Sequence, residues 1–527
     1  MRSFRRRATS AVALLAALTL AACTDGGGES GSSGGGTGGG DDAGSPYTLR
    51  VLASSELSDM EPVLEEARKT TGVTVEPTYV GTLDAVDQIA SGAAEKSYDA
   101  VWLSSNDYLR LRPDTAKKIT GETPVMTSPV ALGLRPDAVR KLGWDPAKVT
   151  WSQIHKAVAM KKLGYGMTDP ARSNSGFSAL VSIASGLSGA QSALTEQDVT
   201  AATPKLKEFF GGQQLTSGSS GWLATAWSRR TDVDALINYE SVLLGMGKDI
   251  TVVRPADGVV TADYPFTLLT TASPDAKQAA ARLTTHLRTP AAQRLITNRT
   301  LRRPVVPGVE LAQPLTADQR RELPFPGSRA VADGLLDAYE NKLRRPSRTV
   351  YVLDTSGSMQ GERLQRLRSA LAELTGDFRD RETVTLMPFG SAVKQNEVRT
   401  YTVDPAAPKK AIGAMRAQAN GLTASGGTAI YSSLKEAYDQ LGPEGDSFTS
   451  IVLMTDGENT DGDPAGAFDA FYRDLPPAQK RTPVFPILFG DSDRTALDHI
   501  ASLTGGRLFD ATTGSLDGAF EEIRGYQ

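Results

Sequence analysis

The chain of 527 residues is poor in the side chains that build disulfides, histidine-based sites and basic surfaces. Its one cysteine allows no disulfide within the chain and no cysteine-rich zinc site. His155, His286 and His499 lie far apart in sequence and offer little for a histidine-based metal or nucleophilic site. Acidic residues (61) outnumber basic ones (57), which excludes a chain-wide basic field for nucleic acid.

Long hydrophobic runs are also missing, apart from a short one near the start. Four arginines within residues 2–7 precede an apolar run over 11–20, which is typical of a secretory signal and is too short to span a bilayer. The run ends in Leu20-Ala21-Ala22-Cys23, which resembles a bacterial lipobox. We therefore predict that residues 1–22 are a lipoprotein signal peptide and that Cys23 carries the lipid. The alternative is an ordinary signal peptide with an incidental cysteine.

Residues 24–46 contain almost no apolar side chains, so they cannot bury enough surface to offset chain entropy. We predict that 23–46 is a lipidated cysteine followed by a Gly/Ser-rich tether with a reach of roughly 25 Å. No later stretch of about 18 apolar residues offers a membrane span. The predicted location is the extracytoplasmic face of the cell membrane, with the lipid as the only anchor.

From Tyr47 onward, short β-rich runs alternate with helical periods, as a parallel α/β sheet requires. Strands are expected over 47–53, 73–79 and 99–103, with helices between them. The first and third of these strands run into hydroxyl-rich loops, and open α/β sheets bind ligands at those carboxyl ends. A further strand over 124–135 begins an expected second lobe.

This order of parts resembles bacterial extracellular solute-binding proteins with the two-lobed type II periplasmic fold. The resemblance rests on the loop 168–176, the stretch 235–245, the ADYPF run at 262–266 and a helix expected over 275–296. It implies a domain over 47–326 with a solute between its lobes. The implied ligand-binding residues are Ser54, Ser55, Ser104, Ser105, Ser173, Asn174, Ser175, Tyr239 and Glu240. Alternatively, each serine is simply a helix cap or a turn residue.

A helix and linker are expected over 327–347, and a new domain over 348–527. An apolar strand there runs directly into Asp354-Thr355-Ser356-Gly357-Ser358, followed by a helix. This Asp-x-Ser-x-Ser pattern resembles the metal-ion-dependent adhesion site of von Willebrand factor A (VWA) domains. Thr428 and Asp456 match the remaining motif positions. The resemblance implies a Rossmann-like, doubly wound α/β fold for this domain.

The chemistry of these five residues agrees with that resemblance. Asp354, Ser356, Ser358, Thr428 and Asp456 offer only oxygen ligands, which Mg²⁺ or Mn²⁺ prefers. Two carboxylates balance the charge of the ion, while neutral hydroxyls leave it electron-poor. An acidic residue of a protein partner is then expected to complete the coordination shell.

Three functions follow from these features. The first is a non-enzymatic surface lipoprotein that binds an extracellular or envelope protein through the metal site and a ligand through the cleft. The second is the substrate-binding component of an ABC-type importer, with the VWA domain as a docking or regulatory module. The third, a metal-dependent hydrolase, is disfavoured because no Ser-His-Asp or paired-carboxylate site stands out. No nucleic-acid partner is expected.

Overall fold

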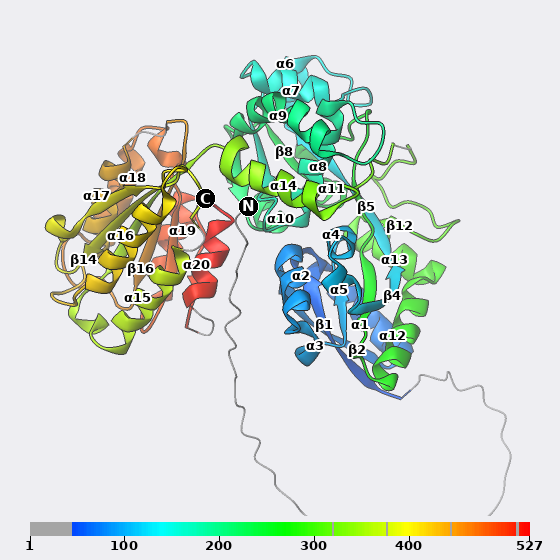
Figure 1. Cartoon of the computed structure of the whole chain (residues 1–527), viewed down its shortest axis with the longest axis horizontal. Helices are drawn as coiled ribbons and strands as arrows, with labels where there is room; N and C mark the ends of the chain where they lie inside the picture. Colours follow the sequence, from blue (N-terminus) through cyan, green and yellow to red (C-terminus); the bar gives the residue numbers. More distant parts are fainter. Residues whose placement is uncertain (1–44, 319–320, 376–377, 443–444, 513–515) are drawn as a thin grey trace, which may run out of the picture.

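A computed structural model describes residues 45–318, 321–375, 378–442, 445–512 and 516–527. The predicted signal peptide, Cys23 and nearly all of the predicted tether lie outside the described residues. The described chain forms three α/β bodies, each built on its own sheet (Figure 1). Within this part of the chain, no helix combines the length and the apolar character needed to cross a membrane.

The first lobe is a five-stranded sheet in the order β2-β1-β3-β11-β4. The strands span Val73–Val80, Tyr47–Ser54, Ala100–Trp102, Pro265–Leu269 and Ile119–Pro124 in that order. β1 pairs with β2 and β3 in parallel, whereas β11 returns late in the sequence and pairs antiparallel with β3 and β4. Helices α1 (Glu61–Thr71), α2 (Thr82–Ser91) and α12 (Pro274–Leu287) flank this sheet.

The second lobe is built on β10-β5-β8-β6-β7. These strands span Thr261–Ala262, Met126–Leu134, Ala235–Tyr239, Tyr165–Thr168 and Gln213–Ser217. Short strands β9 (Thr251–Val253) and β12 (Arg303–Pro304) also pair with β5. Helix α8 (Asn174–Ser188) is buried on nearly every side, as expected of a helix inside a large core. Around it pack α7 (Trp151–Ala159) and α9 (Glu196–Gly211).

Two expected elements are divided in the structure. The strand predicted over 124–135 is interrupted at Val125, so that β4 belongs to the first sheet and β5 to the second. The helix predicted over 275–296 ends at Leu287, and α13 (Pro290–Thr300) begins a new direction. Pro290 lacks an N–H and occupies the first turn, where Thr289 caps the new helix by accepting a hydrogen bond from the Ala292 N–H.

The third body is a six-stranded sheet in the order β15-β14-β13-β16-β17-β18, the doubly wound 3-2-1-4-5-6 order. The strands span Arg399–Thr402, Thr383–Phe389, Ser347–Asp354, Phe448–Thr455, Val484–Leu488 and Phe509–Asp510. Helices α15 (Glu362–Leu374), α16 (Pro408–Gly421) and α20 (Leu516–Arg524) share one core. Helices α17 (Ile430–Leu441), α18 (Ala465–Asp474) and α19 (Arg494–Thr504) build the other.

The segment between the second lobe and the third body packs onto the lobe. Helix α14 (Arg329–Ala338) continues into a π-helical turn, Tyr339–Leu343, that contacts α9. The buried Tyr339 ring lies edge-on to Phe210, and its hydroxyl donates to Gln213 Oε1 at 3.0 Å. These contacts fix Tyr339, and with it the start of the chain that leads into the third body, on the surface of the second lobe.

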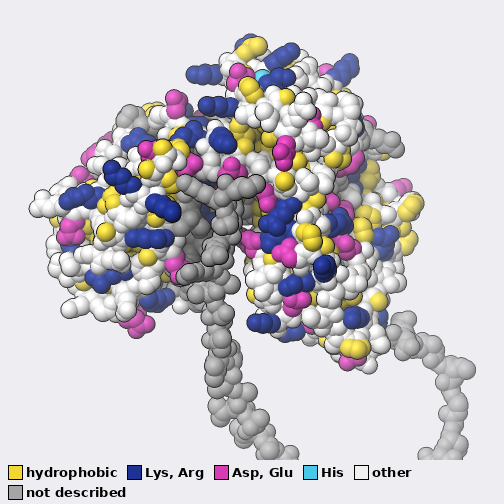
Figure 2. Space-filling model, viewed as in Figure 1, with side chains coloured by type: hydrophobic (Ala, Val, Ile, Leu, Met, Phe, Trp, Pro, Cys, Tyr) yellow, Lys and Arg dark blue, Asp and Glu magenta, His cyan; other side chains and the backbone are white. Residues whose placement is uncertain are grey.

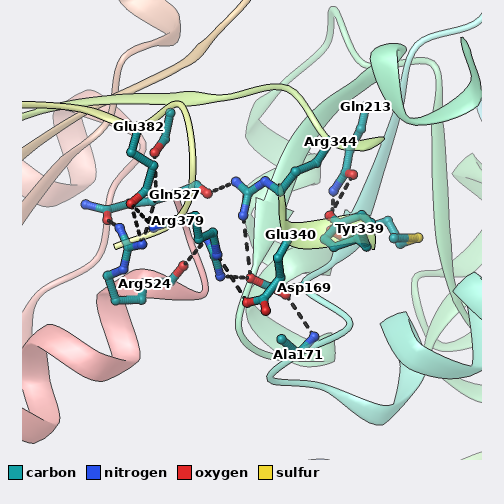
Figure 3. A network of polar contacts seen from close by, with 12 residues as sticks. Asp169, Ala171, Gln213, Tyr339, Glu340, Arg344, Arg379, Glu382, Arg524 and Gln527 are labelled. Carbon is teal, nitrogen blue, oxygen red and sulfur yellow. Dashed lines mark hydrogen bonds and ion pairs between the residues drawn. The ribbon is translucent and has the colours of Figure 1, made fainter. Parts of the chain in front are cut away.

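A network of buried charged side chains connects the second lobe to the linker and to the third body (Figure 3). Asp169 of the second lobe is fully buried, and its Oδ2 lies 2.6 Å from Arg379 Nη2 of the third body and 3.8 Å from Arg344 Nη1 of the linker. Arg379 also contacts Glu340 at 3.2 Å. Burial alone would raise the pKa of the Asp169 carboxyl, but the two arginines outweigh it and hold that pKa below its usual range. The carboxylate is thus charged at neutral pH and depends on its partners.

The network continues inside the third body. Glu382 accepts two hydrogen bonds of 2.8 Å from Arg524 Nη2, and it also accepts one from the Ser347 hydroxyl. Arg344 donates to the backbone carbonyl of Gln527. On the face shown in Figure 2, by contrast, Lys and Arg side chains are interspersed with Asp and Glu.

Replacing Arg379 by Ala should separate the third body from the second lobe. The change removes the closest cation of the buried Asp169 carboxylate and leaves Arg344 at 3.8 Å, and breaking a buried pair costs about 3–5 kcal/mol. Small-angle X-ray scattering should report a larger radius of gyration for this variant. Arg399→Ala is the control, because Arg399 is exposed on β15 and its side chain donates to the neighbouring Val398 carbonyl. An unchanged radius for Arg379→Ala would contradict the assigned role.

Candidate metal centre and solute cleft

The predicted metal ligands lie at the carboxyl edge of the third sheet. Asp354 is the last residue of β13, and Asp456 directly follows β16, the neighbouring parallel strand. Thr428 lies two residues before α17. Because parallel strands end at the same edge, three segments that are distant in sequence meet there.

Hydrogen bonds connect four of the five residues. The Ser356 and Ser358 hydroxyl oxygens are 2.9 Å apart, and the Ser358 hydroxyl donates to Asp456 Oδ1 at 2.9 Å. The Ser356 N–H donates to Asp354 Oδ1 at 2.8 Å. Thr428 faces the same point, because a Cβ placed on Gly457 would lie 3.9 Å from both the Thr428 and the Ser358 hydroxyl oxygens. The structure therefore gathers all five oxygen-bearing side chains.

The site buries its two carboxylates, whereas Ser358 lies exposed at its mouth. Asp354 is fully buried and Asp456 is 1% exposed. Burial raises the pKa of the Asp354 carboxyl, and the nearby Asp456 charge adds to that rise. Hydrogen bonds from Thr455 and Ser356 offset the rise only in part. Two buried carboxylates with neutral hydroxyls between them fit a hard divalent cation, which would relieve their repulsion.

No group of three or more His, Cys, Asp or Glu side chains gathers in the described parts of the chain in a way that could hold a metal ion. A site made of two aspartates and three hydroxyls is consistent with that finding.

Two basic residues that the sequence did not mark as candidates contact the site. Arg363, in the first turn of α15, places Nη1 2.6 Å from Asp456 Oδ2 and Nη2 2.6 Å from Asp491 Oδ2. Lys394 donates to the carbonyls of Thr355 and Thr423 and so ties the two hydroxyl-bearing loops together. Arg363 follows the Asp-x-Ser-x-Ser pattern by one turn, which was the only sequence signal for it.

The close approach of these loops depends on a glycine outside the motif. The Gly357 N–H donates to the Gly426 carbonyl at 2.8 Å, and Gly426 has a φ of +85°. A side chain at Gly426 would be strained by that φ and would lie 3.0 Å from the Ser391 backbone nitrogen. The left-handed turn that the loop requires is therefore at Gly426, whereas Gly357 provides only a close backbone contact.

In the solute-binding-like region, the predicted residues fall into two groups, one in each lobe. In the first lobe, the Thr82 hydroxyl bridges those of Ser54 and Ser104, at 3.0 and 3.2 Å. Ser105 bonds to Asp107 instead, and Ser55 is exposed at the start of a 3-10 turn.

In the second lobe, the Ser175 hydroxyl lies 2.8 Å from that of Thr168 and 2.7 Å from that of Ser220. Ser173 joins this cluster at 3.1 Å from Ser175. Asn174 donates to the Tyr239 hydroxyl at 3.0 Å. Apart from this cluster, Glu240 forms ion pairs with Arg254 and Arg303, so its carboxylate is already neutralised.

Three further residues join the lobes where they meet. The Tyr239 ring of the second lobe lies 6.0 Å from that of Tyr264, which precedes β11 of the first lobe. Arg302 stacks 4.8 Å above Tyr264 and pairs with Asp59 at 2.7 Å. Burial raises the pKa of the Glu56 carboxyl. Burial also raises the pKa of the Tyr239 hydroxyl, and the negative charge of Glu56 adds to that rise. Glu56 directly follows the predicted ligand-binding residue Ser55, and Tyr264 lies in the 262–266 run. Neither residue belongs to a sequence motif that would have predicted a role in the site.

Comparisons with known proteins agree with this architecture. Residues 49–299 match the family model described as bacterial extracellular solute-binding protein, and residues 350–522 match that of the von Willebrand factor type A domain. The chain therefore combines a solute-binding domain with a VWA domain, and the predicted fold class is confirmed.

Among curated proteins, inter-alpha-trypsin inhibitor heavy chain H4 of Bos taurus is 31% identical over 128 residues, which cover 22% of this chain and 13% of that protein. An uncharacterized protein of Synechocystis is 33% identical over 128 residues, covering 24% and 29%. The matched segments span less than a third of these relatives.

Among solved structures, a periplasmic thiamin binding protein has 14% identity and a TM-score of 0.44, covering 56% of this chain and 96% of that one. The periplasmic binding protein AfuA of Actinobacillus pleuropneumoniae has 12% identity and a TM-score of 0.43, covering 56% and 98%. A von Willebrand factor type A protein of Catenulispora acidiphila has 18% identity and a TM-score of 0.29, covering 34% and 42%.

Mg²⁺ should bind the purified protein at one site and raise the midpoint of thermal unfolding of the VWA domain, whereas Asp354→Ala should abolish both effects. A ligand at 100 times its Kd stabilises the folded state by about 2.7 kcal/mol. Isothermal titration and calorimetry would measure these effects. Asp439→Ala is the matched control, because Asp439 is exposed on α17 of the same domain. Parent-like Mg²⁺ binding by Asp354→Ala would exclude this site.

Arg363→Gln should strengthen Mg²⁺ binding by about twofold to fivefold. The guanidinium neutralises one oxygen of Asp456 and competes with a cation for its charge, and such partly exposed pairs contribute up to about 1 kcal/mol. Isothermal titration of this variant would measure the effect. Arg366→Gln is the control, because Arg366 lies on the same helix as Arg363 and stacks over the Phe489 ring. An unchanged or weaker affinity for Arg363→Gln would disprove the competition.

Proposed function

We propose that this chain is a lipid-anchored receptor on the extracytoplasmic face of the cell membrane, which binds a protein partner through a Mg²⁺-dependent VWA site. The single observation that carries the proposal is the buried pair Asp354 and Asp456 at a sheet edge, linked through the Ser356 N–H and the Ser356 and Ser358 hydroxyls. The family of the first domain, described as extracellular, implies the extracytoplasmic location. The anchor rests on the sequence around Cys23.

Each residue has a defined role in the proposed site. Asp354 and Asp456 would balance the charge of Mg²⁺ or Mn²⁺, and the hydroxyls of Ser356, Ser358 and Thr428 would supply neutral oxygens. The bound ion would supply an electrophilic centre for a carboxylate of the partner. Arg363 contacts Asp456 Oδ2 and would compete with the ion for the charge of that carboxylate, which leaves Oδ1, bonded to Ser358, for the ion. Neutral ligands suit such bridging better than water activation, and the proposed role is accordingly non-enzymatic.

The second candidate is the substrate-binding component of an ABC-type importer, with the VWA domain as a docking or regulatory module. It is favoured by the match of residues 49–299 to solute-binding proteins and by the buried clusters of hydroxyl and amide side chains in each lobe. A small solute would then contact Ser104, Asn174 and Tyr239. Both candidates use the cleft, but only the first requires the metal for recognition.

Affinity capture from envelope extracts should recover a partner with the parent protein in Mg²⁺ and not in EDTA. Asp354→Ala should lose the same partner in Mg²⁺, because its metal ligand is gone, while Asp439→Ala retains it. Mass spectrometry of the captured material would identify the partner. A partner that persists through both EDTA and Asp354→Ala would shift recognition to the solute-binding domain and favour the importer.

A further inference from the structure

A pocket of about 450 Å³ lies between the second lobe and the VWA domain, away from both sites described above. One wall comes from β7 and α10 (Ser220–Arg229) of the lobe. The other comes from the start of β16, the segment around 477–485 and the end of α19. Ligand pockets in proteins measure about 300–1,000 Å³, so the space suits a small organic molecule.

The pocket carries an excess of positive charge. Arg230 Nε lies 2.8 Å from Asp232 Oδ1, and Arg481 of the VWA domain approaches Asp232 Oδ2 at 3.1 Å. Arg229 and Lys480 also line the pocket, so its lining holds four basic side chains and one carboxylate. A concave surface of this charge attracts anions.

The second feature is an aromatic wall built by both domains. Trp222 of α10 meets Tyr526 edge-on at 4.6 Å between ring centroids, and it lies 6.4 Å from Phe485 of β17. All three side chains line the pocket. A flat apolar group could pack there next to the basic side chains, which an inorganic anion would not exploit.

Two buried oxygens on β7 lack hydrogen-bond partners among the described residues. They are Gln214 Oε1 and Thr216 Oγ1, and Thr216 is 5% exposed. The two residues alternate along the strand, so they share one face, and both line the pocket. Buried polar groups normally have partners. The Thr216 hydroxyl could donate to an acidic oxygen of a ligand, whereas the Gln214 carbonyl oxygen, which only accepts, would need a ligand hydroxyl or N–H.

We propose that this interdomain pocket is a binding site for a small organic anion with an aromatic or similarly flat apolar body. Arg230 and Arg481 hold the acidic group, and Trp222, Phe485 and Tyr526 contact the body. Because the walls belong to different domains, the ligand binds the docked arrangement more tightly than the separated one. Binding therefore stabilises docking by linkage, independently of the metal site and the cleft.

Isothermal titration of the purified full-length protein with phenyl phosphate tests the proposal. One site per chain is expected, with a Kd at least tenfold lower than for inorganic phosphate, which lacks the ring, or for benzyl alcohol, which lacks the charge. Absence of saturable binding, or equal affinity for phenyl phosphate and inorganic phosphate, overturns the proposal.

Two variants locate the site on both domains. Arg481→Gln alters the VWA wall and Trp222→Leu the wall of the lobe, and each should weaken phenyl phosphate binding about tenfold. Arg473→Gln, an exposed neighbour on α18, should bind like the parent. Small-angle scattering of each variant with saturating phenyl phosphate should give the radius of the docked parent. Parent-like affinity in either pocket variant overturns a site shared by the two domains.

Discussion

The arrangement of the whole chain depends on one desolvated carboxylate, that of Asp169. A charge buried at this depth is tolerated only beside opposite charge, and its partners Arg379 and Arg344 come from the VWA domain and the linker. Asp169 also begins the turn that leads to Ser173 and α8, since its carbonyl accepts the Ser173 N–H at 2.9 Å. The loop that carries residues of the solute cleft is therefore the same loop that fixes the VWA domain.

The contact between Asp169 and Arg379 is a physical link through which the solute-binding-like domain and the VWA domain could influence each other. A displacement of the 168–176 loop on solute binding would move Asp169 relative to Arg379, and short charge pairs of 2.6 Å are sensitive to such shifts. The metal site is more remote, but Arg379 lies just beyond α15, the helix whose first turn holds Arg363. The interdomain pocket adds a second contact between the domains. Under the proposals made above, ligands of either site would alter the relative position of the domains.

The grouping of the candidate metal ligands was predictable from sequence to an unusual extent, because these residues occur in short local patterns. Asp354, Ser356 and Ser358 share one loop, and Thr428 and Asp456 each border a regular element whose type could be inferred. The cleft was less predictable. Tyr239 and Tyr264 meet only because the chain crosses between lobes at Val125 and again before β11, and the 124–135 segment had been expected to form one strand.

The sequence by itself determined the order of the domains, the α/β class of each and the oxygen-only side chains of the candidate metal site, because these follow from hydrophobic periodicity and local motifs. Only the tertiary structure decided that Arg363 binds Asp456, that Glu240 is neutralised by two arginines and that Asp169 faces Arg379. Those contacts join residues separated by up to 210 positions. Their partners are selected by burial and packing in three dimensions, and no pattern along the chain encodes which buried charge will meet which.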